Sequence, residues 1–215
     1  MSGITYDYMS MYLKGLIGES KGIIKDLEDY AEKNNVPIVR EETARLIEFM
    51  VTTKRPKRIL ELGTAIGYSS ILMAITLNND VKITTIERDK DMVEIAKANI
   101  KKAKLENNIN VIEGDCLNVL ENLNEEFDMI FIDAGHGHYC EFLPHCLRVL
   151  SKDGMIMADN VLFRGMVACN ELMVRRKITI VKRMRKYLEM VSRDENLITT
   201  VLPMGDGIAL TVRRN

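Results

Sequence analysis

The sequence has no long apolar run and no strong charge of either sign. No uninterrupted apolar stretch approaches the roughly 18 residues of a membrane-spanning helix, and the first fifteen residues, MSGITYDYMSMYLKG, lack the apolar core of a signal peptide. The formal net charge is only −1, so no basic field covers the whole molecule. We therefore expect a cytoplasmic protein without a membrane partner, in which any contact with nucleic acid depends on a local basic patch.

Paired cysteines are also absent. The four cysteines lie at positions 116, 140, 146 and 169 and form no CxxC motif. Their spacing suits neither a disulfide framework nor a structural zinc site. The 215 residues are 47% hydrophobic and 28% charged, which is ordinary for a globular domain. Because no repeat, low-complexity segment or linker interrupts the chain, we expect one domain over residues 1–215.

Short β-branched runs alternate with longer helical patterns from residue 58 onward. This alternation is typical of an α/β fold, a doubly wound and mostly parallel sheet with helices on both faces. The expected strands are residues 58–62, 82–87, 109–113, 127–132, 154–158, 196–202 and 207–213. The expected helices are residues 68–78, 89–104, 116–122, 139–150 and 170–193. Because the PMGDG turn before the last strand is too short for a crossover, the C-terminal strand should be antiparallel.

Helical patterns also precede the sheet, so we expect residues 1–55 to form an N-terminal helical cap. Apolar side chains share one face of the first helix, and two further helices, residues 20–34 and 40–52, follow. Such a face can pack on the sheet, cover the ligand site or form a homodimer interface. The sequence leaves these alternatives open, and a homodimer is one expectation.

A glycine turn follows the first expected strand, in the stretch ILELGTAIGYSS at residues 59–70. Gly63 ends the strand and Gly67 precedes a helix, so free backbone N–H groups can face a ligand there. Position 65 is alanine where a dinucleotide site has glycine, and Glu61 would repel a pyrophosphate. The GK[ST] of a P-loop is missing. An acid beside this turn suits a ligand with an amino group and a sulfonium, and S-adenosylmethionine (SAM) is such a ligand.

The next two expected strands also end at acids. Glu87 lies where a carboxylate can accept the ribose hydroxyls of a nucleotide, and Asp115 and Cys116 fall where we expect the adenine. Taken alone, each acid is more often a helix cap or a loop charge. Together, Glu61, Glu87 and Asp115 are three acids in register at successive strand ends. One ligand lying across these strand ends explains them better.

Oxygen-bearing side chains follow the fourth and fifth expected strands. Asp133 ends one strand, and Asp159 and Asn160 end the next. Two carboxylates and an amide oxygen form half of a shell for Mg²⁺ or another hard divalent cation, which could hold a hydroxyl near a methyl donor. The alternative is that the two aspartates cap loops and that Asn160 forms a turn.

Several motifs of the sequence resemble those of a known enzyme family. ELGTAIGYSS, IERD, GDC, FIDAGHGHY and ADNVLFRG, in this order and spacing, resemble the cation-dependent O-methyltransferases that include the catechol and caffeoyl-CoA enzymes. YAEKNNVPIV and PMGDGIAL make the chain most similar to the bacterial tRNA 5-hydroxyuridine methyltransferases. The resemblance implies a Rossmann-like class I SAM methyltransferase with a seven-stranded sheet. It also implies a set of cofactor contacts: Val39, Glu61, Gly63, Tyr68, Ser69, Glu87, Asp115, Cys116 and Asp133.

The resemblance further implies that Asp133, Asp159 and Asn160 bind the divalent cation, with Asp133 at the catalytic centre. Family members commonly carry a lysine in a D-x-x-K-x-x-Y pattern, and that lysine is usually assigned as base or orienting cation. In this sequence His136 occupies the position. A neutral histidine is a competent base near pH 7, so His136 is a candidate catalytic residue. A loop histidine that points to solvent is the alternative, and His138 has a weaker claim.

A basic segment, residues 172–193, bears on the substrate. It holds eight lysines and arginines against one acid, and an apolar stripe from residue 174 to residue 191 should face the core. A charge run on a helix is usually a solvated face, but RNA could lie here. The candidate RNA contacts are Arg164, Arg175, Arg176, Lys182 and Arg183.

These observations predict a metal-assisted methyl transfer from SAM to an oxygen. The expected substrate is 5-hydroxyuridine at the wobble position of a tRNA anticodon loop, whose adjacent oxygens would chelate the cation as a catechol does. The alternatives are a small catechol-like or phenolic substrate and, in another class, a nucleotide-binding oxidoreductase or a non-catalytic adenosine-binding module.

Overall fold

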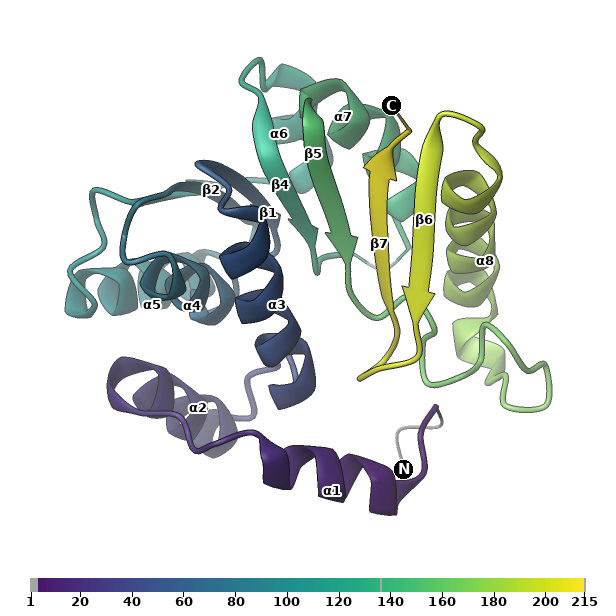
Figure 1. Cartoon of the computed structure of the whole chain (residues 1–215), viewed down its shortest axis with the longest axis horizontal. Coiled ribbons are helices and arrows are strands. Elements are labelled where there is room, and N and C mark those ends of the chain that lie inside the picture. The colour runs from purple at the N-terminus through teal and green to yellow at the C-terminus, as the bar shows by residue number, and fades with distance from the viewer. Residues whose placement is uncertain (1–3, 136, 215) are drawn as a thin grey trace.

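The computed structural model describes residues 4–135 and 137–214. Its centre is one seven-stranded sheet in the order β3-β2-β1-β4-β5-β7-β6, with helices around it (Figure 1). The strands are β1 (Arg58–Leu62), β2 (Lys82–Glu87), β3 (Ile109–Glu113), β4 (Phe127–Ile132), β5 (Leu150–Ala158), β6 (Leu197–Leu202) and β7 (Ile208–Arg213).

Three helices precede the sheet, and the others connect its strands. They are α1 (Asp7–Leu16), α2 (Gly22–Asn34), α3 (Glu41–Lys54), α4 (Tyr68–Thr76), α5 (Lys90–Lys102), α6 (Cys116–Asn122), α7 (Tyr139–Val149), the short 3-10 helix η1 (Arg175–Lys177) and α8 (Ile178–Arg193). Within the described part of the chain, no helix combines the length and the apolar character that a membrane span requires.

The sheet is parallel except for its last strand. The pairs β1–β2, β2–β3, β1–β4 and β4–β5 are parallel, and β7 lies antiparallel between β5 and β6. The predicted mixed sheet with an antiparallel C-terminal strand is therefore confirmed. The chain winds outward from β1 to β3 and then returns to β4, which creates a switch point between β1 and β4. Ligands of doubly wound sheets bind at such a point, outside the carboxyl ends of the strands.

The core has two layers because alternate residues of each strand point to opposite faces. In β1, Ile59 packs with α2, α3, α4 and α5, whereas Leu60 and Leu62 pack with α6, α7 and α8. All three side chains are fully buried. This two-sided burial explains why the sequence of β1 reads as a nearly continuous apolar run.

Two predicted elements differ from the structure. β5 begins at Leu150, four residues before the expected start. The helix expected from residue 170 begins only at Ile178, after η1. Residues 170–174 instead form turns and irregular backbone, and η1 follows them before α8 begins. Val174, predicted to face the core, is consequently 48% exposed.

Candidate functional site

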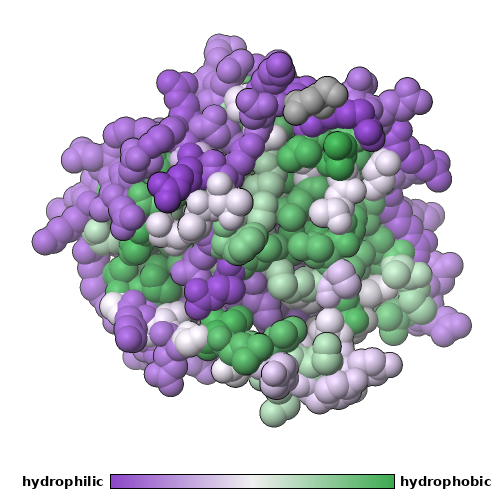
Figure 2. Space-filling view, in the orientation of Figure 1, coloured by the Kyte–Doolittle hydropathy of each residue, from purple (hydrophilic) through white to green (hydrophobic). Residues whose placement is uncertain are grey.

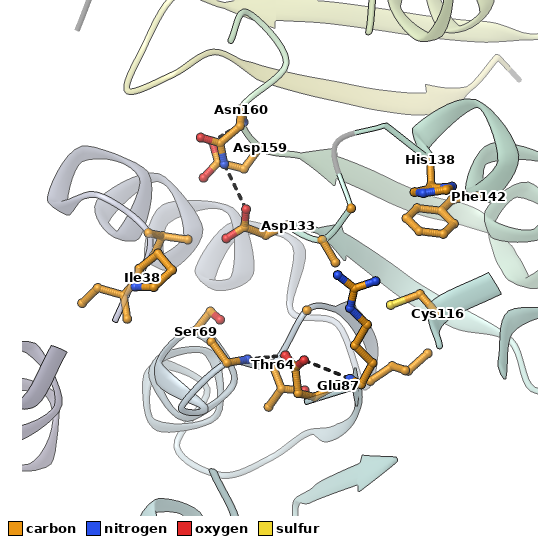
Figure 3. A pocket seen from close by; sticks show the side chains of 18 of the residues that line it. Ile38, Thr64, Ser69, Glu87, Cys116, Asp133, His138, Phe142, Asp159 and Asn160 are labelled. Atoms are coloured by element: carbon orange, nitrogen blue, oxygen red, sulfur yellow. Dashed lines mark hydrogen bonds between the residues drawn. The ribbon is translucent and has the colours of Figure 1, made fainter. Parts of the chain in front are cut away.

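A cavity of 510 Å³ opens at the carboxyl ends of the central strands, at the switch point. Figure 3 shows side chains from the segments that follow these strands lining the cavity, with Asp133 near its centre. Most residues predicted from the sequence line this cavity: Val39, Gly63, Tyr68, Ser69, Glu87, Asp115, Cys116, Asp133, Asp159 and Asn160. The structure therefore brings the predicted cofactor and metal residues into one site.

The glycine turn is packed tightly against the end of β4. Gly63 has φ 100°, and a Cβ atom at this position would lie 2.7 Å from the backbone oxygen of Asp133. Ala65 has φ 44°, an uncommon value for a residue with a side chain, and its backbone N–H donates to Glu87 (2.9 Å). The turn thus brings the ends of β1, β2 and β4 together beneath the cavity.

Glu61 lies behind the cavity wall. It is fully buried and accepts hydrogen bonds from the hydroxyls of Ser69, Ser70 and Thr85. Burial raises the pKa of Glu61, and these three hydrogen bonds oppose that shift. Ser69 lines the cavity whereas Glu61 is not among the lining residues, so a direct contact between Glu61 and the cofactor stays a prediction.

Both acids at the ends of β2 and β3 are held by backbone groups. Glu87 accepts hydrogen bonds from the N–H groups of the next two residues (2.9 and 3.0 Å) and from Ala65. Asp115 caps α6 by accepting from the N–H groups two and three residues later (3.0 and 3.4 Å). The capping alternative is therefore correct for Asp115, and both side chains nevertheless line the cavity.

Cys116 and Tyr68 contribute neutral groups to the wall. Burial, assisted by the charge of Asp115, raises the pKa of the Cys116 thiol to about 12, so this thiol is not a nucleophile near neutral pH. The Tyr68 hydroxyl donates to Glu28 of α2 (2.9 Å), and burial together with this contact raises its pKa. That hydrogen bond joins the N-terminal helices to the cavity.

Acidic and amide groups gather above the glycine turn. The Asn160 side-chain nitrogen donates to Asp133 (2.9 Å), and the Asn160 backbone N–H donates to Asp159 (2.6 Å). Burial raises the pKa of Asp159 to about 6, and the nearby charge of Asp206 adds to the shift. Burial, Asp159 and Glu61 likewise raise the pKa of Asp133 well above its usual range. Two carboxylates thus occupy the centre of the site: Asp159 is buried and Asp133 is half-buried, and the charge of Asp159 disfavours the ionised form of Asp133.

A polar cluster forms another part of the rim. His138 Nδ1 lies 2.5 Å from Glu141, and both residues line the cavity. The guanidinium of Arg183, on α8, donates to the backbone oxygen of Gly137 (2.9 Å) and lies 3.9 Å from Glu141. The basic helix therefore contacts the segment that connects β4 to α7.

The tyrosine of the D-x-x-K-x-x-Y pattern is structural. Tyr139 is fully buried, and its hydroxyl donates to the backbone oxygens of Asp159 (2.9 Å) and Ile132 (3.2 Å). It therefore joins the ends of β4 and β5, which carry Asp133 and Asp159. His136, the candidate base, lies outside the described residues, so its role stays a prediction.

The predicted RNA contacts lie on different segments of the chain and differ in whether the side chain already has a partner. Arg175 and Arg176 lie in η1 and Lys182 in α8, and all three are exposed. Arg164 is also exposed, and its backbone N–H donates to Asp206. Arg183 differs because its side chain already binds Gly137.

Some cavity residues were not identified in the sequence. Arg40 and Thr43 come from the start of α3, and Asp206 comes from the PMGDG turn, which the sequence indicated only as a tight connection. The motif YAEKNNVPIV ends at Val39, the residue before Arg40, and was therefore a usable signal for the start of α3. The acid inside PMGDG was a usable signal, because a tight turn at the carboxyl edge places its side chains near the other strand ends.

Comparisons with known proteins agree with this geometry. The family model described as O-methyltransferase matches residues 17–214. A caffeoyl-CoA O-methyltransferase of Stellaria longipes is 30% identical over 180 residues, covering 79% of this chain and 73% of the relative. A catechol O-methyltransferase of Niastella koreensis is 30% identical, with 99% of both chains covered.

Solved structures show the same fold. A candidate caffeoyl-CoA O-methyltransferase of Staphylococcus aureus has a TM-score of 0.89 and 35% identity, covering 97% of this chain and 100% of its own. A Bacillus cereus O-methyltransferase in complex with SAH superposes with a TM-score of 0.83 at 24% identity, covering 96% and 97% of the two chains. The chain therefore belongs to the O-methyltransferase family and is a SAM-dependent O-methyltransferase of the caffeoyl-CoA and catechol type.

Proposed function

We propose that this enzyme methylates the 5-hydroxyl of 5-hydroxyuridine at the tRNA wobble position, with the help of a divalent cation. The observation that supports the RNA substrate is the contact of Arg183 with Gly137, because it joins the basic helix to the rim of the cavity. RNA lying on the exposed side chains of η1 and α8 would bring an unstacked loop base toward this rim. The cytoplasm, where tRNA is modified, is the proposed location.

The residues at the centre of the site suit a hard cation such as Mg²⁺. Among the described residues, no group of three or more histidine, cysteine or acidic side chains is arranged as a metal site. The proposed donors are two carboxylates and one amide oxygen, the ligand type that Mg²⁺ prefers. The hydrogen bond between Asn160 and Asp133 already brings two of these side chains together. To coordinate the same cation, Asn160 would turn its amide oxygen, rather than its nitrogen, toward it.

Each group has a distinct role in this proposal. SAM supplies the methyl group, and the cation supplies a positive charge that favours the deprotonated form of the substrate hydroxyl. The S–CH₃ bond breaks as the O–CH₃ bond forms, and the hydroxyl proton leaves to a base, for which His136 is the candidate. Ser69 and Glu87 hold the donor, while Asp133 and Asp159 orient the acceptor. Catalysis then depends chiefly on positioning.

A small catechol-like or phenolic acceptor is the second candidate. Several relatives are described by their action on caffeoyl-CoA or catechol, and two adjacent oxygens on a ring would meet the same donor set. The Phe142 ring beside His138 offers such a substrate an apolar wall, with ring centroids 6.1 Å apart. This alternative keeps the chemistry and removes the role of the basic helix.

Methylation by the purified enzyme separates the two substrates. With SAM and Mg²⁺, we expect tRNA that carries 5-hydroxyuridine to gain 5-methoxyuridine, measured by mass spectrometry of its nucleosides. A chelator should abolish the reaction and excess Mg²⁺ should restore it. Efficient methylation of a free catechol with unmodified 5-hydroxyuridine in tRNA would overturn the tRNA assignment. Full activity in the chelator would overturn the metal assignment.

A further inference from the structure

The start of α3 forms part of the cavity wall. Arg40 and Thr43 both line the cavity. The Arg40 guanidinium donates to the backbone oxygen of Gly205 (3.5 Å), and a Cβ atom at Gly205 would lie 2.9 Å from the Thr43 hydroxyl oxygen. In Figure 1, α3 and the turn that joins β6 to β7 lie near each other below the middle of the view, and Figure 2 shows hydrophilic atoms among apolar ones there. Polar groups of α3 therefore face the turn that carries Asp206.

Arg40 is the positive charge at this end of the cavity. Burial raises the pKa of Asp159 and the charge of Arg40 opposes that rise, so the guanidinium lies near the carboxylate proposed to orient the acceptor. Among the described residues, one other arginine and no lysine line the cavity, and that arginine, Arg88, follows Glu87, where the donor is proposed to bind. Arg40 is exposed, and a single long hydrogen bond, to Gly205, engages its several N–H donors in the described part of the chain. Most of these donors are therefore available to a ligand.

The Thr43 hydroxyl lacks a hydrogen-bond partner. Thr43 is 1% exposed, and its oxygen is one of three buried side-chain atoms without a partner in the described part of the chain, with Glu42 Oε2 and the Tyr187 hydroxyl. Of these three residues, only Thr43 lines the cavity. Buried hydroxyls are nearly always hydrogen-bonded, because a buried polar group without a partner has lost its bonds to water. A polar ligand atom in the cavity would supply the missing partner.

The first turn of α3 supplies further donors. The helix begins with a hydrogen bond from the Ala44 N–H to the Arg40 oxygen (2.8 Å), and no described side chain caps this end. The backbone N–H groups before Ala44 therefore have no partner within the helix, and such a helix start attracts anions. The two acids of this turn do not line the cavity: Glu41 pairs with Lys14 (3.3 Å) beside a second cavity, and Glu42 is buried. The donors thus remain open to a ligand.

We propose that Arg40, Thr43 and the start of α3 form a phosphate-binding subsite, which holds a phosphate group flanking the nucleotide to be methylated. An arginine fork, a hydroxyl and free helix N–H groups offer more donors than a carboxylate can use, whereas phosphate oxygens can accept from all of them. The proposed divalent cation would offset the charges of Asp133 and Asp159, so that a phosphate beside them is not repelled. The subsite rests on the proposed function, because a free catechol carries no phosphate.

Calorimetry of the full chain, with SAH and Mg²⁺ present, measures what phosphate contributes to acceptor binding. The probes are 5-hydroxyuridine and 5-hydroxyuridine 3′,5′-bisphosphate, which differ only in their phosphates. The wild-type enzyme should bind the bisphosphate roughly tenfold more tightly than the nucleoside. Arg40→Gln should remove most of this difference, and Thr43→Val should reduce it about threefold. Neither variant should change the affinity for the nucleoside or for SAH.

Arg45→Gln is the matched control. Arg45 lies on the same helix, pairs with Glu48 (2.9 Å) and does not line this cavity, so the variant should keep the wild-type preference for the bisphosphate. Thr43→Val should also melt no lower than the wild type without ligand, because the substitution removes a buried hydroxyl that has no partner. A hydroxyl with a purely structural role would instead leave a less stable variant with unchanged phosphate binding.

Several results would overturn the subsite. Equal wild-type affinity for the two probes would show that phosphate contributes nothing, although the nucleotide acceptor would still stand. A preference for the bisphosphate that survives in both variants would place the phosphate elsewhere. Weaker SAH binding by Arg40→Gln would assign these donors to the carboxylate of the cofactor. If the wild-type enzyme binds neither probe and leaves 5-hydroxyuridine in tRNA unmethylated, the proposed function fails, and the subsite fails with it.

Discussion

Arg183 is the residue that joins the basic helix to the rim of the cavity. Its guanidinium holds the Gly137 backbone oxygen and lies near Glu141, which in turn contacts His138 on the cavity wall. Arg183→Gln removes a charge-assisted hydrogen bond at a half-exposed site, which is worth about 1 kcal/mol. We expect SAH to bind roughly threefold to tenfold more weakly, as measured by calorimetry, and methyl transfer to any acceptor to fall as well.

A neighbouring lysine provides the control for this variant. Lys186 is exposed on the same helix and has no hydrogen bond or ion pair with the described residues. Lys186→Gln should leave SAH affinity unchanged. If Arg183→Gln and Lys186→Gln gave the same affinity as the wild type, Arg183 would be no more than a surface charge. The sequence could not indicate this role, because Arg183 and Gly137 are 46 positions apart and no motif joins them.

At the scale of elements, η1 and the start of α8 carry the case for RNA. Replacing Arg175, Arg176 and Lys182 by glutamate changes the local charge by about −6 without touching the Arg183 contact. We expect tRNA binding to weaken at least tenfold at low salt, and the slope of log affinity against log salt to become shallower. Filter binding over a salt series measures both quantities, and Arg183 is kept unchanged so that the cavity stays intact.

Small-molecule methylation by the same triple variant is the control for this experiment. Turnover of a catechol should remain near the wild-type rate, since none of the three side chains lines the cavity. Unchanged tRNA affinity would show that this charge run is only a solvated face. The second candidate substrate would then be favoured.

The elements differ in how far the sequence could predict them. β2 and β4 were placed correctly, because β-branched and apolar residues dominate each strand and a polar residue, Glu87 or Asp133, stands at or directly after its end. The start of α8 was placed too early. Val174 continues the helical spacing of apolar residues, although it lies before η1 and outside the helix. The spacing of apolar residues alone does not show at which residue a helix begins after a turn. The candidate base, His136, depended wholly on the family pattern.

At the scale of the whole molecule, the central carboxylates lower stability when no cation is bound. Burial raises the pKa values of both Asp133 and Asp159, with the charge of Asp159 adding to the shift of Asp133 and the charge of Asp206 adding to that of Asp159, so their charged forms are unfavourable in the folded state. A cation that binds the folded protein but not the unfolded chain should stabilise it. The melting temperature in Mg²⁺ should therefore exceed that in a chelator at pH 7.5.

Asp159→Asn gives this stability prediction its sharpest form. Without cation, the variant should melt about 2–4 °C above the wild type, because one of two repelling charges is gone and roughly 1 kcal/mol is recovered. Its response to Mg²⁺ should be lost, since a carboxylate proposed as a ligand is missing. Asp153→Asn, at an exposed position before the buried half of β5, is the control and should keep the wild-type response. Differential scanning calorimetry measures all three proteins. An Asp159→Asn protein that Mg²⁺ stabilises as much as the wild type would place the cation elsewhere.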